Sequence, residues 1–138
     1  MSAILNSERI NRNSSLPEPK RFLNRVIHKH RIAMPHINDI PEKQLVPGIV
    51  GQYIHGEKTS FGWVTLKAGS RFTTHHHPHE QVTCILEGEL EMVIGGVTKI
   101  LTPGMVEVIP GGVPHSAIVK VDSIVIDVFS PVREEYRG

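Results

Sequence analysis

Residues 69–88 read GSRFTTHHHPHEQVTCILEG, which joins a histidine-rich tract to a run of strand-forming residues. Side chains alternate along an extended segment, so His75 and His77 point the same way with their Cα atoms about 7 Å apart. That separation lets two imidazole nitrogens converge on one metal ion, at about 2.0–2.2 Å each. The tract therefore predicts a metal site at the point where this segment enters a β-sheet.

Two further side chains are candidates for the same site. Gln81 has the parity of the two histidines, whereas its neighbour Glu80 has the opposite parity, so we favour Gln81 as a ligand and keep Glu80 as the alternative. His115 follows a Gly-Gly-Val-Pro sequence and opens a predicted strand, from which it could close the site. For His76 and His79 we expect solvated positions in a surface loop.

The body of the chain reads as strands. From Val46 onward, short β-branched runs alternate with turn residues at regular spacing, and no stretch after residue 40 has a helical period. Gly95-Gly96 permits the positive φ angles of a tight hairpin. Even spacing of short strands predicts an all-β sandwich or barrel. The predicted strands are Ile49–His55, Phe61–Lys67, Glu80–Leu86, Glu89–Ile94, Val97–Leu101, Met105–Ile109, His115–Val121 and Ile124–Phe129.

Composition limits the class of protein. The chain has 138 residues, enough for one domain with a core, and its 39% hydrophobic and 21% charged fractions disfavour intrinsic disorder. The single cysteine, Cys84, excludes an internal disulfide and fits a reducing compartment. No apolar run approaches the length of a membrane span, and the first ten residues lack the apolar core of a signal peptide. We therefore expect a soluble, cytoplasmic protein without a membrane partner.

Charge divides the chain into a basic arm and an acidic body. Residues 1–36 carry seven Lys or Arg against two Glu, while residues 37–138 carry eight basic and twelve acidic side chains. The positive charges of the arm are dispersed and lack aromatic neighbours, so we do not expect a nucleic-acid partner. Within the arm, the start is expected to be flexible, and residues 21–32 could supply a first strand or a segment exchanged between subunits.

Residues 40–138 resemble the cupin superfamily. They match the spacing of both of its sequence motifs, the first in Gly69, His75, His77, position 81 and Gly88, and the second in Gly104, Pro110, Gly112 and His115. The resemblance implies a double-stranded β-helix, or jelly-roll barrel, for residues 37–138. It also implies a metal inside the barrel and commonly a homodimer.

The sequence departs from the cupin motifs at two positions. The usual glutamate ligand is replaced by Gln81, and the closing asparagine of the second motif by Val119. Three neutral imidazoles and a neutral amide leave the full charge on one divalent ion, which favours polarisation of a substrate oxygen over redox cycling. The metal could be Zn, Ni, Mn or Fe, since imidazole suits all four.

The C-terminal stretch 124–136 carries a second group of candidates. Asp127 lies inside an apolar run, where a carboxylate is costly unless it is paired or hydrogen-bonded. A structural ion pair with Arg133 is one explanation, and a general base with a raised pKa is the other.

This tail and the histidine tract together resemble small cupins of the pectin-degradation KdgF type, which promote ring opening of 4,5-unsaturated uronates to linear keto sugars. The basic segment 1–36 has no counterpart in that resemblance. The resemblance to the KdgF type implies metal ligation by His75, His77, Gln81 and His115. It also implies a substrate-facing role for Asp127, Phe129 and Arg133.

The leading hypothesis is thus a metal-dependent cupin that isomerises a small anionic sugar, with Asp127 moving a proton and Arg133 pairing with a carboxylate. The alternatives are a metal-dependent dioxygenase on the same scaffold and a cupin that binds a small molecule without turnover. Arg71 is a second candidate anion partner, although we favour a solvated edge position for it. Trp63 is expected in the core or at a subunit interface.

Overall fold

The computed structural model describes residues 36–137, and within that range it contains strands and two short 3-10 turns but no α-helix. This confirms the all-β prediction. No described helix has the length and apolar character that crossing a bilayer requires. The basic arm, including residues 21–32, lies outside the described residues. The elements are η1 Ile37–Asp39, β1 Glu42–Val46, β2 Ile49–His55, β3 Ser60–Leu66, β4 Arg71–His75, β5 Glu80–Ile94, β6 Val97–Leu101, β7 Val106–Ile109, β8 His115–Ser130 and η2 Glu134–Tyr136.

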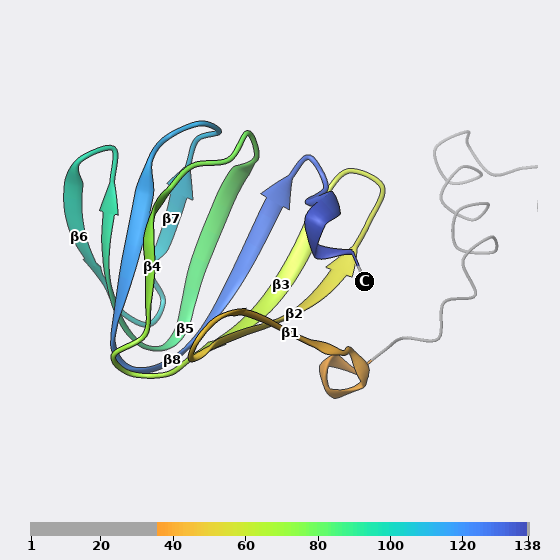
Figure 1. Ribbon diagram of the computed structural model, residues 1–138, viewed down its shortest axis with the longest axis horizontal. Helices are drawn as coiled ribbons and strands as arrows, with labels where there is room; N and C mark the ends of the chain where they lie inside the picture. The colour runs from red at the N-terminus through yellow and green to blue at the C-terminus, as the bar shows by residue number, and fades with distance from the viewer. Residues whose placement is uncertain (1–35, 138) are drawn as a thin grey trace, which may run out of the picture. The chain divides into compact units, whose positions relative to one another are not determined.

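Two long antiparallel strands, β5 and β8, form the frame of the fold. Their paired residues run from Glu80 opposite Ser130 to Ile94 opposite His115. One half of this ribbon is flanked by β7 on one side and by β3, β2 and β1 on the other, and the other half is flanked by β6 and β4. In Figure 1 both strands turn back at the lower edge of the view, so each contributes to both sheets. The result is a jelly roll, the double-stranded β-helix.

The bend in β5 corrects one sequence prediction. Glu87-Gly88 was expected to end a strand, yet β5 continues through it by a series of bulges between Ile85 and Leu90. Gly88 has φ +89°, and a Cβ there would collide with the hydroxyl of Ser123 and lie 2.6 Å from the carbonyl oxygen of Asp122. The glycine therefore permits the close approach of the two long strands where they pass between sheets. In the same way, β8 joins two runs that were expected to be separate strands.

Two short strands, β1 and β4, were not predicted from the sequence, because their side chains are mostly exposed or half-buried and lack apolar alternation. Both are edge strands: β1 pairs with β2, and β4 pairs with β8. They do not pair with each other, so the barrel is open between them. The Gly95-Gly96 hairpin was predicted correctly, with φ angles of 55° and 83°.

The core fills the space between the two sheets. Its members alternate along the strands with outward-facing residues, as period-2 patterning requires. The most deeply buried apolar side chains are Ile49, Val64, Leu66, Ile85, Leu90, Ile109, Val119, Val125 and Phe129. Most of these residues lie towards the closed end of the barrel, where β5 and β8 bend, although Ile109 lies opposite Gln81. The polar residues of the same inner face gather around the open end, where β4 leads into β5.

Gly88→Ala tests the crossing of the long strands. The new methyl group would meet Ser123 and the backbone of Asp122 at a positive φ, so we expect a loss of about 3 kcal/mol or more in the free energy of unfolding. Gly96→Ala is the matched control, because Gly96 has φ +83° but no atom within 4 Å of its Cβ position. Urea denaturation should separate the two variants, and equal losses would contradict the account.

Candidate metal centre

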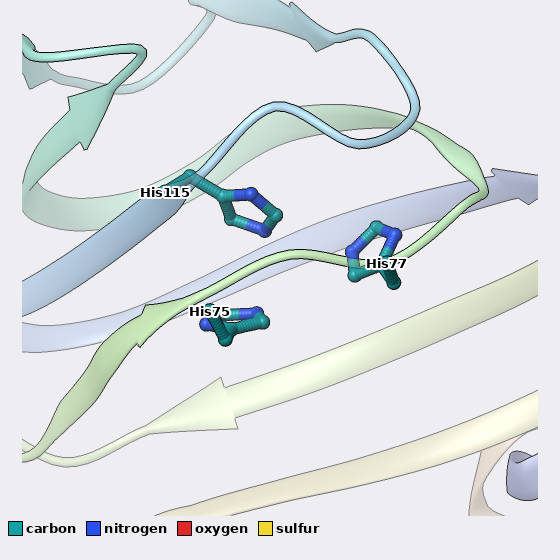
Figure 2. A group of neighbouring side chains, drawn as sticks. All are labelled: His75, His77 and His115. Carbon is teal, nitrogen blue, oxygen red and sulfur yellow. The ribbon is translucent and has the colours of Figure 1, made fainter.

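Three imidazoles from two distant parts of the chain converge at the open end of the barrel. His75 ends β4, His77 lies in the connection to β5, and His115 opens β8. The pairing of β4 with β8 places His75 directly opposite His115. The candidate ligand atoms of the three residues all lie within 4.8 Å of one another. Figure 2 shows their rings facing a common point.

Backbone carbonyls orient all three rings. Nδ1 of His75 lies 2.8 Å from the carbonyl oxygen of Thr73, and Nδ1 of His115 lies 2.9 Å from that of Val113. Nδ1 of His77 lies 3.1 Å from the carbonyl oxygen of residue 79. A carbonyl can only accept, so each Nδ1 carries the proton and each Nε2 presents a lone pair. Hydrogen bonds of this kind are the usual means by which proteins orient metal-binding histidines.

The electrostatic state of the rings suits a cation. Burial, followed by the charge of Arg133, lowers the pKa of His77 to about 4. Burial likewise lowers the pKa of His115, whose Nε2 is buried without a hydrogen-bond partner. Neutral imidazoles with unshared lone pairs are what a divalent metal requires. The three histidines therefore fit a divalent ion and could hold one.

Gln81 extends this donor set. Its Oε1 lies 3.1 Å from Nε2 of His77, and its amide nitrogen donates to the hydroxyl of Thr83 at 2.9 Å and to Oδ1 of Asp127 at 3.1 Å. These two acceptors fix which end of the amide faces the histidines. Two lone pairs, on Oε1 and on Nε2, therefore face each other, an arrangement that a cation between them would satisfy. Glu80, the alternative candidate, is exposed and points away from the site.

Asp127 lies behind Gln81 on the inner face of β8. The Thr83 hydroxyl donates to its Oδ1 at 2.6 Å, in addition to the Gln81 amide. Burial raises the pKa of this carboxyl, and the two hydrogen bonds oppose that shift. Asp127 thus links the candidate ligand Gln81 to the interior of the barrel. The alternative explanation, an ion pair with Arg133, does not appear among the ion pairs of the described residues.

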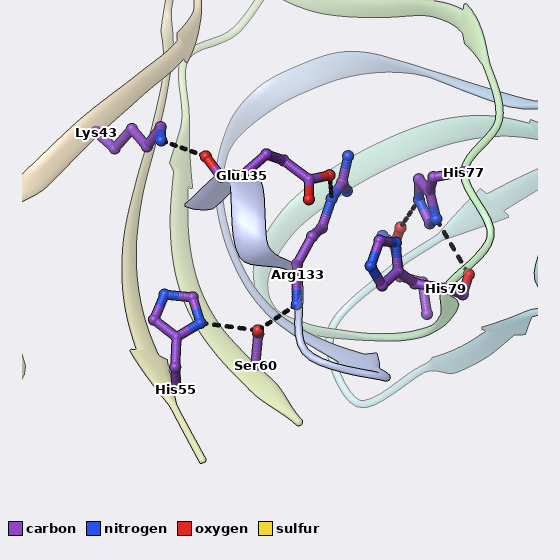
Figure 3. A network of polar contacts seen from close by, with 8 residues as sticks. Lys43, His55, Ser60, His77, His79, Arg133 and Glu135 are labelled. Atoms are coloured by element: carbon purple, nitrogen blue, oxygen red, sulfur yellow. Dashed lines mark hydrogen bonds and ion pairs between the residues drawn. The ribbon is translucent and has the colours of Figure 1, made fainter. Parts of the chain in front are cut away.

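Arg133 instead pairs with Glu135, whose Oε1 lies 2.6 Å from its Nε (Figure 3). The guanidinium carbon lies 4.8 Å from the ring centroid of Phe129 and 4.2 Å from that of Tyr136. The backbone of Arg133 is held by the hydroxyl of the buried Ser60 at 2.8 Å. A cation is therefore held in a fixed orientation at the mouth of the barrel by two aromatic rings.

The site includes a cavity and a groove. A cavity of about 50 Å³ lies inside the barrel, and the polar residues that line it include His75, His115, Gln81, Thr83, Asp127 and Arg133. A groove of about 320 Å³ adjoins it between β1 and β4. Leu45, Phe72, His75, Arg133 and Tyr136 line both spaces. The groove thus leads from the surface to the histidines.

Two tyrosines of the cavity were not found from the sequence. Tyr53 is 9% exposed, and its ring centroid lies 4.5 Å from that of Tyr136. A Cβ on Gly62 would lie 2.5 Å from the Tyr53 ring, and one on Gly51 would also collide with it. The only sequence signal was therefore a pair of glycines inside two neighbouring strands.

The flanking histidines behave differently from each other. His76 is exposed, as expected of a surface loop. The same expectation was wrong for His79, which is 8% exposed and packs its ring 5.6 Å from that of His77. The chain bends at Pro78, so His79 points inward with His77 and Gln81, and its carbonyl oxygen accepts a hydrogen bond from Nδ1 of His77.

Comparison with known proteins agrees with this architecture. The family model described as "Cupin domain" matches residues 62–129. No curated protein sequence matches the chain.

Several solved structures also resemble the chain. KdgF from Halomonas sp. is 29% identical, with a TM-score of 0.68, and the match covers 72% of this chain and 94% of that one. An RmlC-like cupin from Shewanella frigidimarina is 27% identical, with a TM-score of 0.72 and coverage of 76% and 96%. Ectoine synthase from P. lautus, at 22% identity and a TM-score of 0.66 over 73% of this chain and 79% of that one, shares the fold alone. Taken with the three converging histidines, these matches support a small cupin that resembles KdgF.

Proposed function

We propose that this cupin is a metal-dependent enzyme that opens the ring of a 4,5-unsaturated uronate, with His75, His77, His115 and Gln81 as ligands of one divalent metal. The observation that carries the proposal is the buried Asp127 carboxylate, which lines the same cavity as His75 and His115 and is hydrogen-bonded to Gln81. When bound, a divalent ion supplies Lewis-acid polarisation of a substrate oxygen. The resemblance to KdgF supports the choice of reaction.

The reaction is an isomerisation. A proton leaves the hydroxyl on C1 and a proton reaches C4, while the bond between C1 and the ring oxygen breaks. C1 becomes an aldehyde and the former ring oxygen becomes a ketone oxygen at C5, so no oxidant, reductant or other co-reactant is consumed. Asp127 accepts the first proton and delivers the second, as base and then acid.

Two other residues of the site bind and shield the substrate. Arg133 pairs with the substrate carboxylate through its terminal nitrogens, because its Nε already contacts Glu135. Phe129 is 2% exposed, and its ring lies 5.7 Å from that of His77. The aromatic face excludes water beside the reacting atoms and offers a surface on which a flat unsaturated ring can pack.

We also propose a homodimer, supported by two neighbouring rows of uncharged residues on the outer face of the sheet of β2, β3, β8, β5 and β7. Cross-strand pairing forms both rows. Each row takes one residue from each of the five strands and so spans roughly 20 Å, at about 4.8 Å between neighbouring strands. Contiguous apolar surface of this kind marks interaction sites, and a second copy offers the same uncharged rows. The rows are Val108, Val82, Val128, Phe61, Ile54 and Val106, Cys84, Ile126, Trp63, Gln52.

Elemental analysis tests the metal site. The wild-type protein should carry about one divalent metal ion per chain, and His77→Ala should lose it because one of three convergent imidazoles is gone. His76→Ala is the matched control, since its exposed side chain lies in the same tract and should leave the metal content unchanged. Full metal occupancy in His77→Ala would contradict the proposed ligand set.

Turnover of an unsaturated uronate, followed by the loss of its ultraviolet absorbance, tests the reaction. Asp127→Asn keeps an oxygen that can accept from Gln81 and Thr83, so we expect retained metal with activity lower by about 10²–10⁴-fold. An unchanged rate would exclude Asp127 from proton transfer. Oxygen consumption during turnover would instead favour a dioxygenase, and tight binding without reaction would favour a binding cupin.

Analytical ultracentrifugation tests the proposed interface. Val106 is 58% exposed, so Val106→Glu should leave the subunit folded yet place a charge in the uncharged rows and produce monomers. Ile118→Glu is the control, because Ile118 is 43% exposed on the outer side of the other sheet. A dimer that survives Val106→Glu but is lost in Ile118→Glu would place the interface on the other sheet and contradict the proposal.

A further inference from the structure

The groove between β1 and β4 has a charge pattern that the proposed function does not yet explain. Nine residues line it, none of them acidic, and two of them, Lys43 and Arg133, are cationic. Arg71, the second cation suggested by the sequence, is exposed on β4 and does not line the groove. The second cation of this groove is therefore Lys43, on the edge strand β1 that sequence reasoning missed.

Lys43 and Arg133 both lie near the aromatic ring of Tyr136. Nζ of Lys43 lies 5.6 Å from the ring centroid of Tyr136, and the guanidinium carbon of Arg133 lies 4.2 Å from the same centroid. The ammonium of Lys43 also donates to the backbone carbonyl oxygen of Glu135 at 2.6 Å (Figure 3). Both cations are thus fixed by the short C-terminal segment that closes the mouth of the barrel.

The two cations differ in how far they are neutralised. Arg133 contacts the carboxylate of Glu135 at 2.6 Å, which offsets its charge. Among the described residues, Lys43 donates only to the neutral backbone carbonyl of Glu135 and pairs with no carboxylate, so its charge in the groove is not offset. A lysine ammonium has three N–H donors, and that carbonyl takes one. The net positive charge of this entrance therefore belongs to Lys43.

The dimensions of the two spaces say which part of a ligand lies here. Pockets for small molecules have volumes of roughly 300–1,000 Å³. The inner cavity of about 50 Å³ falls well below that range, whereas the adjoining groove of about 320 Å³ falls within it. A sugar that reaches the histidines must therefore extend into the groove beside Lys43.

We propose that Lys43 is a specificity-determining residue that binds the carboxylate of an anionic sugar from the groove side, while Arg133 binds it from the cavity side. The inference rests on the proposed function for its choice of ligand class, but it concerns recognition and not turnover. The site takes a monosaccharide carboxylate and discriminates against the neutral sugar of the same shape.

Isothermal titration calorimetry with galacturonate and galactose, on the full-length protein as purified, tests this proposal. Lys43→Gln should weaken galacturonate binding roughly tenfold or more, the effect of losing a hydrogen bond to a charged group. Lys43→Arg should restore most of the affinity. Lys67→Gln is the matched control, because Lys67 is a 68% exposed lysine beyond the far end of β3 and should bind like wild type.

The outcomes separate a recognition role from a structural one. Galactose affinity that is unchanged in Lys43→Gln supports the proposal, because only the charged ligand uses the ammonium. Equal weakening of both sugars would overturn it and assign Lys43 to support of the C-terminal segment alone. Wild-type protein that binds galacturonate no better than galactose would also overturn it. Because these binding measurements do not require turnover, they would still test the role of Lys43 if the ring-opening reaction were not observed.

Discussion

Cross-strand pairing of His75 with His115 is the constraint on which the site depends. The two residues are forty positions apart, and they meet because β8 lies between β4 and β5 over residues 115–118. That arrangement requires both long strands to pass from one sheet to the other, which in turn requires a glycine at position 88. Local steric freedom at the closed end of the barrel therefore determines whether the imidazoles can converge at the open end.

A chain of hydrogen bonds connects the histidines to the interior of the barrel. Gln81 faces His77 through its carbonyl oxygen because its amide nitrogen is taken by Thr83 and Asp127. The amide at position 81, where cupins usually have a glutamate, is therefore matched to Asp127, because an ionised carboxylate at position 81 could not donate a hydrogen bond to Asp127. The carboxylate at 127 and the amide at 81 form one unit, which explains why a costly buried acid stands in an otherwise apolar strand.

Sequence patterns predicted the strands that bury one face and the residues that share parity at the site. Runs of strand-forming residues between turn signals identified β2 and β6, the glycine pair identified the hairpin at Gly95-Gly96, and motif spacing grouped His115 with the tract around His75. Edge strands such as β1 were missed because an exposed strand needs no apolar alternation. Continuity of β5 through Gly88 was missed because a glycine in a bulge and one in a turn look alike in sequence.

The mouth of the barrel was the least predictable part of the site. Arg133 finds its carboxylate partner two residues away in Glu135, and Lys43 reaches the same segment from a strand ninety residues earlier. Such pairings depend on how the C-terminal segment packs against Tyr53 and Phe129, and no periodic pattern encodes that packing.

X-ray absorption spectroscopy at the edge of whichever divalent metal copurifies tests the central claim most directly. We expect a first coordination shell of nitrogen and oxygen at about 2.0–2.2 Å, with the outer-ring scattering of three imidazoles. In a His115→Ala protein reloaded with that metal, the imidazole signal should fall to two. A spectrum without imidazole scattering, or one that the His115 substitution leaves unchanged, would contradict a metal centre built from both segments of the chain.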